Sequence, residues 1–149
     1  MPSSISKVES FLTASEEGEI IDAIRAAELN TSGEIRVHLE GHYEGDHFTH
    51  AGDIFRFLHM DNTKNSNGVL IYIAVEDRTL VILGDKGINQ VVPEHFWNST
   101  KDTILQHFKS GAIKQGLVEG IQEAGKQLKA HFPYDSGDTN EISNEISRS

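Results

Sequence analysis

The segment NGVLIYIAVEDRTLVILGDKG, residues 67–87, decides the fold. Residues 69–75 are almost continuously apolar and β-branched, and residues 79–83 are similar; such runs are typical of strands buried on both faces. Only Glu76, Asp77 and Arg78 separate the two runs, which leaves room for a tight turn alone. The segment therefore predicts an antiparallel hairpin of two buried strands.

Two helices and one strand are predicted before the hairpin. Thr13 and Glu16 fit a capping box, and apolar residues follow at helical spacing as far as Asn30, which predicts an amphipathic helix. Residues 34–40 alternate apolar and polar side chains, the period of a half-buried strand. Residues 41–50 are polar and predict a loop. A short second helix is then indicated by the spacing of Ile54, Phe55 and Leu58.

Two more helices are predicted after the hairpin. Pro93 suits the first turn of a helix that carries Phe96 and Trp97, and a longer helix ends before Pro133. Three glycines interrupt the longer helix, although each costs a helix interior about 1 kcal/mol relative to alanine. We therefore expect the backbone there to lie close to a neighbouring element. These glycines are Gly116, Gly120 and Gly125.

The order helix, strand, helix, strand, strand, helix, helix predicts an α/β fold, a three-layer α/β/α sandwich around a small mixed sheet with helices on both faces. The first two strands are joined through a helix and should be parallel. We expect an N-terminal segment at residues 1–14, one domain at residues 15–133 and a disordered acidic tail at residues 134–149. In that tail Ile142 and Ile146 are the only aliphatic residues.

Composition disfavours several kinds of site and partner. The 149-residue chain has no cysteine, which rules out disulfides, thiolate zinc sites and cysteine nucleophiles. Its formal net charge of −10 disfavours nucleic acid and anionic membrane surfaces as partners. No apolar run reaches the roughly 18–20 residues of a membrane span, and residues 1–13 lack the features of a signal peptide. We therefore expect a cytoplasmic protein.

Strand direction predicts which polar corners meet. The first two strands begin, and the third ends, at one edge of the sheet, so three glycine-bearing turns should converge there. Glu34 and Asp85 supply carboxylates at this edge, and Ser32 and Asn67 supply neutral oxygens, the ligand type that calcium and magnesium prefer. Asn-Gly and Gly-Asp are also ordinary turn sequences, so the pattern has a purely structural explanation as well.

A second set of candidate metal ligands lies in the loop at residues 41–50. We expect this loop at the opposite edge, beside Glu40 and the hairpin turn at Glu76 and Asp77. Its nitrogen and oxygen ligands suit zinc or another transition metal, but their spacing matches no standard zinc signature, and a surface loop often contains histidines without a special role. The candidate ligands are His42, Asp46, His47 and His50.

Three segments match a family pattern in order: SGEIRVHL (32–39), NGVLIYIAVEDRTLVILGDKGIN (67–89) and FKSGAIKQGLVEGIQEAGKQLKAHFP (108–133). They resemble the three conserved blocks of the TPM domain family, which includes thylakoid lumen proteins. The resemblance covers about residues 16–133 and implies an α/β/α sandwich with a Rossmann-like arrangement. Many relatives have a Gly-Tyr-Gly turn where this chain has residues 84–87, GDKG, so the charges inserted here either bring a ligand or alter the family's site.

The resemblance also implies an activity. A plant member of the family is associated with acid phosphatase activity, and related domains are linked to divalent cations. We favour calcium over magnesium, because a site built from loops tolerates irregular, high coordination. If the chain hydrolyses phosphomonoesters of a small molecule, the metal would polarise the phosphoryl oxygens, with Asp85 and Glu34 as ligands or bases. Lys86 would counter the phosphate charge, so Asp85 and Lys86 are the candidate catalytic residues.

A non-catalytic protein-interaction module is the alternative function. The docking surface for a partner protein would lie near Phe96 and Trp97. The single tryptophan of a chain this size usually lies in the interior, so both aromatic residues are also explained as core residues.

Overall fold

The predicted hairpin forms strands β2 (Gly68–Ala74) and β3 (Thr79–Gly84) in the computed structural model, which describes residues 8, 10–93, 95–134 and 143–149. The two strands are antiparallel, from Val69 opposite Gly84 to Ala74 opposite Thr79. Every residue of β2 is buried, as its continuous apolar sequence predicts.

Strand β1 (Glu34–Glu40) lies on the other side of β2 and is parallel to it. Helix α3 (His47–Phe57) connects them, so the predicted crossover is confirmed. The register places Glu34 opposite Gly68 and Glu40 opposite Ala74. Both strands therefore begin at one edge of the sheet, where β3 ends.

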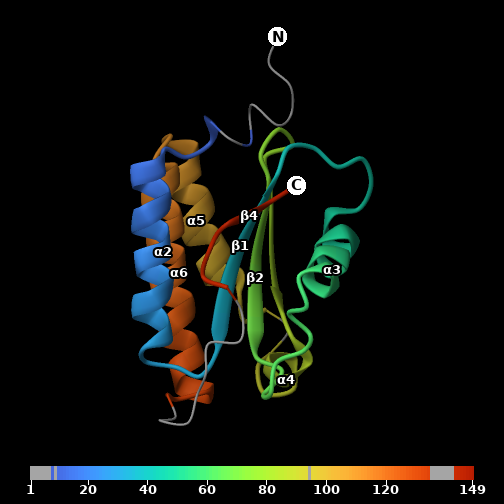
Figure 1. Cartoon of the computed structure of the whole chain (residues 1–149), viewed down its shortest axis with the longest axis vertical. Helices are drawn as coiled ribbons and strands as arrows, with labels where there is room; N and C mark the ends of the chain where they lie inside the picture. Colours follow the sequence, from blue (N-terminus) through green and yellow to red (C-terminus); the bar gives the residue numbers. More distant parts are fainter. Residues whose placement is uncertain (1–7, 9, 94, 135–142) are drawn as a thin grey trace.

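Helices cover both faces of the sheet (Figure 1). On one face lie α2 (Ala14–Glu28), α5 (Asn98–Lys109) and α6 (Ile113–His131), over a core that includes Val69, Ile71 and Ile73 of β2. On the other face lies α3, over a smaller core that includes Leu70, Tyr72 and Ala74. The three-layer α/β/α sandwich is thus confirmed.

Strand β1 is apolar on one face only. Ile35, Val37 and Leu39 belong to the larger core. Because side chains alternate along a strand, the intervening residues face the α3 side, and His38 and Glu40 among them are buried. The α3 face of the sheet therefore contains a buried polar row, which is where one of the sites below is built.

The glycines of α6 lie where neighbouring helices pass close to its backbone. A Cβ atom at Gly116 would lie 2.8 Å from His107 Cβ in α5, and one at Gly125 would lie 2.8 Å from Ala27 Cβ in α2. Both distances are shorter than carbon atoms tolerate, so α6 packs between α2 and α5 only because these positions lack side chains. The close approach expected from the sequence is confirmed.

Two helix boundaries differ from the sequence-based expectation. Helix α3 begins at His47, inside the predicted loop, because Asp46 caps it by accepting a hydrogen bond from Thr49 N at 3.0 Å. Helix α5 begins at Asn98 and does not include Phe96 or Trp97. The intervening segment forms turns; Phe96 N donates to Pro93 O at 3.1 Å. A short helix, α4 (Lys86–Asn89), follows β3 directly.

Both ends of the chain are more involved in the core than the sequence predicts. Val8 and Leu12 of the N-terminal segment belong to the larger core. The expected disorder at residues 134–149 is wrong for residues 143–149, where β4 (Ser147–Arg148) pairs in parallel with β1 and Ile146 is 6% exposed. Residues 135–142 lie outside the described residues. The sheet order is β3-β2-β1-β4.

No helix in the described part of the chain combines the length and the apolar character needed to cross a bilayer.

Candidate functional site

The three polar corners predicted from strand direction lie on one rim of the sheet. Glu34 N donates to Asn67 O at 3.3 Å, which joins the start of β1 to the start of β2. Asn67 Nδ2 donates to Ser32 Oγ at 3.3 Å. Asp85 N donates to Gly68 O at 2.9 Å, which joins the end of β3 to the same place. We call this set of corners the rim.

Two acidic residues line one pocket at the rim. Glu34 is only 4% exposed, and it lines a pocket of about 560 Å³ together with Ser32 and Glu28, the last residue of α2. Burial raises the pKa of Glu28 to about 7; a hydrogen bond from Ile35 N, 2.9 Å from Oε2, opposes this shift, and the charge of Glu34 adds to it. Glu28 therefore carries a proton near neutral pH far more often than an ordinary glutamate.

Asp85 occupies the same rim but on the other side of β2. It caps α4, with Lys86 N donating to its Oδ1 at 2.7 Å. Its other oxygen, Oδ2, is buried and has no hydrogen-bond partner among the described residues. Lys86 is exposed beside it. Asp85 does not line the pocket of Glu28 and Glu34, so the structure brings Ser32, Glu34 and Asn67 together and leaves Asp85 as a neighbour.

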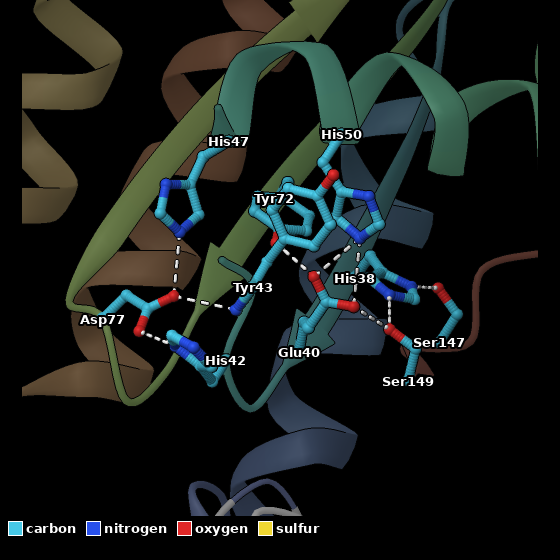
Figure 2. A network of polar contacts seen from close by, with 10 residues as sticks. All are labelled: His38, Glu40, His42, Tyr43, His47, His50, Tyr72, Asp77, Ser147 and Ser149. Atoms are coloured by element: carbon cyan, nitrogen blue, oxygen red, sulfur yellow. Dashed lines mark hydrogen bonds and ion pairs between the residues drawn. The ribbon is translucent and has the colours of Figure 1, made fainter. Parts of the chain in front are cut away.

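At the opposite edge, Asp77 in the hairpin turn holds the loop that precedes α3 (Figure 2). His42 Nδ1 lies 2.5 Å from Asp77 Oδ1, and His47 Nε2 lies 2.8 Å from Oδ2. Tyr43 N donates to Oδ2 at 3.0 Å. The hydrogen bond with His42, followed by those from Tyr43 and His47, holds the pKa of Asp77 below its usual value, and Asp77 raises the pKa of His42.

Glu40, at the end of β1, is the centre of a second network at this edge. Tyr72 donates its hydroxyl proton to Glu40, Ser149 Oγ donates at 2.8 Å, and His50 Nε2 lies 2.8 Å from the carboxylate. Burial raises the pKa of Glu40, but the three hydrogen bonds together outweigh burial and bring its pKa below the usual value. Burial, reinforced by Glu40, raises the pKa of Tyr72. Glu40 is therefore a buried carboxylate with a full set of donors.

His38 links the network to the C-terminal strand. Its Nδ1 lies 2.8 Å from Ser147 Oγ and its Nε2 lies 2.8 Å from Ser149 Oγ. Because Ser149 has one hydroxyl proton and donates it to Glu40, Nε2 of His38 carries a proton and donates to Ser149. Burial lowers the pKa of His38 to about 4, and the attraction of Glu40 offsets this only in part.

The candidate transition-metal ligands of residues 41–50 do not converge on one point, because they contact different partners. His42 and His47 contact Asp77, His50 contacts Glu40, and Asp46 caps α3. No group of three or more His, Asp or Glu side chains is placed to hold a metal ion in the part of the chain that the structure describes. The predicted meeting of this loop with Glu40 and Asp77 is confirmed.

Several participants were not singled out from the sequence. Glu28 reads as an ordinary residue at the end of an amphipathic helix, and its burial depends on the next strand. Ser147 and Ser149 fall in the segment expected to be disordered. Tyr72 reads as one more residue of a buried strand; the signal that could have found it is the hydroxyl, which needs a partner when buried.

The TPM domain family profile matches residues 5–127. No curated protein matches the chain by sequence. Among solved structures, BA42 from the psychrophilic bacterium Bizionia argentinensis is 58% identical, with a TM-score of 0.90 over 97% of this chain and 99% of that one.

Two more distant structures share the fold. The N-terminal domain of a P. gingivalis protein has a TM-score of 0.68 at 20% identity, covering 87% of this chain and 88% of that one. The N-terminal domain of cg2496 from Corynebacterium glutamicum has a TM-score of 0.61 at 12% identity, covering 91% and 79%. The profile match spans most of the chain, and the similarity to BA42 extends over nearly all of it. The chain therefore belongs to the TPM domain family.

Proposed function

We propose that this TPM domain binds a divalent cation at the rim, calcium in preference to magnesium. The observation that carries the proposal is the shared pocket of Glu28 and Glu34. Burial is the main cause of the raised pKa of Glu28, and the negative charge of Glu34 adds to it, so ionisation of both groups together is disfavoured. A divalent cation between them would replace the proton on Glu28 and remove the repulsion.

Neutral oxygens complete the ligand set in this proposal. Ser32 Oγ lines the same pocket and accepts a hydrogen bond from Asn67, which orients its remaining lone pair. Two carboxylates, a hydroxyl, backbone carbonyls and water make an irregular oxygen shell. Calcium accepts such a shell, whereas magnesium demands near-octahedral geometry.

Hydrolysis of phosphomonoesters is the second part of the proposal. Glu34 and Asp85 flank β2, so their backbones are about 10 Å apart at the usual spacing of neighbouring strands. An ion at Glu34 would therefore bind a phosphoryl oxygen while the partly exposed Asp85 serves as a base for water on the other side. Lys86, exposed next to Asp85, would compensate the phosphate charge.

A calcium titration followed by amide chemical shifts tests the cation site. We expect saturable shifts at Ser32, Gly33 and Glu34, and loss of binding in Glu34→Gln. Asp53→Asn is the matched control, because Asp53 is an exposed carboxylate of α3 that pairs with Arg56 and lies outside the pocket. Unchanged calcium affinity in Glu34→Gln, or equal losses in both variants, would refute the site.

Turnover of a generic phosphomonoester from acid to neutral pH, with and without a chelator, tests the catalytic part. Activity that needs calcium and falls in Asp85→Asn supports it. If calcium binds but no turnover is seen, the catalytic part is wrong and the cation site stands.

Protein binding near Phe96 and Trp97 is the alternative. Both side chains are half-buried, with ring centroids 4.8 Å apart, and Trp97 packs against the larger core. This partial burial leaves less apolar surface for a partner than exposed rings would. The alternative gains support only if neither calcium binding nor turnover is found.

A further inference from the structure

A cavity of about 1010 Å³ lies far from the rim, under the hairpin turn and beside α5. Its walls come from the end of β2, the start of β3, the C-terminal half of α5 and the turn before α6. The volume is at the upper end of the roughly 300–1,000 Å³ typical of small-molecule sites. Neither the family comparison nor the proposed cation site uses this cavity.

The wall of the cavity is apolar and incompletely sealed. Ile73 and Leu80, both buried, form part of it. Around them lie five apolar side chains that pack against the larger core and remain partly exposed: Phe11, Val75, Leu105, Phe108 and Ile113. Partly exposed apolar side chains gathered around one cavity favour an apolar occupant, since each would lose its remaining contact with water.

Two cations also line the cavity. Arg78 lies in the hairpin turn and Lys109 is the last residue of α5, and neither makes an ion pair or a side-chain hydrogen bond with another described residue. They are notable in a chain with a net charge of −10. Asp102 is the one acidic residue among the described wall residues, and it disfavours a ligand with two negative charges.

The backbone at Arg78 adds a separate observation. Its φ is 53°, in the left-handed region where glycine and asparagine are the usual residues. An arginine in this place is less favourable for the turn than either, so a role for its guanidinium group is a natural explanation.

We propose that this cavity binds an amphipathic monocarboxylate of the fatty-acid type. The alkyl chain lies against Leu105, Phe108 and Ile113, and the carboxylate is held by Arg78 and Lys109. A guanidinium group binds a carboxylate through two parallel hydrogen bonds, which gives preference over neutral and cationic head groups. No covalent step is involved.

Titration of the full chain with dodecanoate, below its micelle concentration, tests the proposal by amide chemical shifts and calorimetry. We expect saturable one-to-one binding with shifts in residues 103–113 and in Leu80. Dodecanol should bind more weakly and dodecylammonium more weakly still. Dodecyl phosphate, as a dianion, should not exceed dodecanoate; stronger binding of the phosphate would overturn the assignment of the head group.

The charge contribution is tested with Arg78→Asn combined with Lys109→Gln. Asparagine accepts the left-handed backbone, so this variant removes charge without straining the turn. We expect dodecanoate affinity to fall about tenfold, as two partly exposed charge contacts would give, while dodecanol affinity is unchanged. The matched control is Lys126→Gln combined with Lys129→Gln, which removes two exposed charges of α6 outside the cavity.

Two results would overturn the proposal. One is the absence of saturable dodecanoate binding to the folded wild-type chain. The other is an equal loss of dodecanoate affinity in the two double variants, which would mean that only net charge matters.

Discussion

Ser149 and His38 are joined by a hydrogen bond of 2.8 Å between Oγ and Nε2, although 111 positions separate them in the chain. The same hydroxyl donates to Glu40 at 2.8 Å. The C-terminal residues thus complete the hydrogen bonding of a buried imidazole and a buried carboxylate at once, two groups that would be costly to leave without partners.

Docking of the C-terminal segment should stabilise the fold measurably. Ile146→Ala removes a buried side chain from the larger core, and we expect it to lower the free energy of unfolding by about 2 kcal/mol. Arg148→Ala removes a partly exposed ion pair with Glu17 and should cost less than about 1 kcal/mol. Urea denaturation of both variants checks the order. Equal effects would contradict the prediction that core packing of Ile146 contributes more than the ion pair.

The buried histidine should make stability depend on pH in acid. His38 titrates near 4 in the folded chain and near 6.5 when unfolded, so between these values the unfolded state binds a proton that the folded state does not. Its contribution to stability is therefore complete above pH 6.5 and is lost as the pH falls to 4. His38→Gln should remove this pH dependence of stability, which amounts to about 3 kcal/mol across the interval. Denaturation at several pH values gives the slope, and an unchanged slope would contradict the assignment.

Glu28 should make the protein less stable as the pH rises, the opposite of the effect of His38, when divalent ions are absent. Its pKa is about 7 when folded and 4.5 when unfolded, so the folded state retains a proton between these values. Its contribution is complete below pH 4.5 and is lost as the pH rises to 7. Glu28→Gln keeps an oxygen for Ile35 N and should be more stable than the wild type at pH 8, by about 3 kcal/mol.

The two slopes overlap between pH 4.5 and 6.5 and have opposite signs there. In His38→Gln the free energy of unfolding should therefore vary with pH as Glu28 alone dictates, and in Glu28→Gln as His38 alone dictates. In the double variant it should be nearly independent of pH over this interval. A wild-type curve that both variants leave unchanged would rule out both assignments.

Asp77 should control the titration of His42. The carboxylate raises the pKa of His42, chiefly through their hydrogen bond. In Asp77→Asn we expect the His42 midpoint, followed by ring proton shifts in NMR, to move down toward the ordinary histidine value. His95, which has no contact with Asp77, is the internal control. A midpoint for His42 that does not move would place its partner elsewhere.

The glycines of α6 should resist substitution despite lying in a helix. Gly116→Ala would place Cβ against His107 Cβ and 3.1 Å from the carbonyl oxygen of Ile104, neither of which can rotate away. We expect a loss of about 1–3 kcal/mol, more than the gain in helix propensity. Gly18→Ala in α2 meets no atom within 4 Å and should instead stabilise by up to about 1 kcal/mol. Thermal denaturation of the two variants compares the signs directly.

The sheet could be predicted from sequence because its signals are local. Residues 69–83 carry an unbroken strand pattern with a short turn, and strand direction then fixes which corners meet. The glycines of α6 likewise predicted a close contact, because glycine destabilises a helix interior and is expected there only where a neighbouring element leaves no space for a side chain.

The missed features depend on distant residues. A strand as short as β4 has no period to detect, and its order comes from His38, Leu39 and Glu17, which lie more than a hundred positions earlier. The start of α3 was hidden because Asp46 and the histidines after it look like a polar loop. The raised pKa of Glu28 could not be predicted, because it depends on burial that exists only in the folded chain.

Pairing of β4 with β1 also has a consequence for the order in which the protein folds. Ser147 and His38 lie 109 positions apart, and closing a loop of that length costs entropy that the few bonds of a two-residue strand repay poorly. We therefore expect β4 to dock last during folding and to detach first during local opening. The amide of Ser149, which donates to Leu39 O at 3.0 Å, should then exchange with deuterium well before the amides of β2.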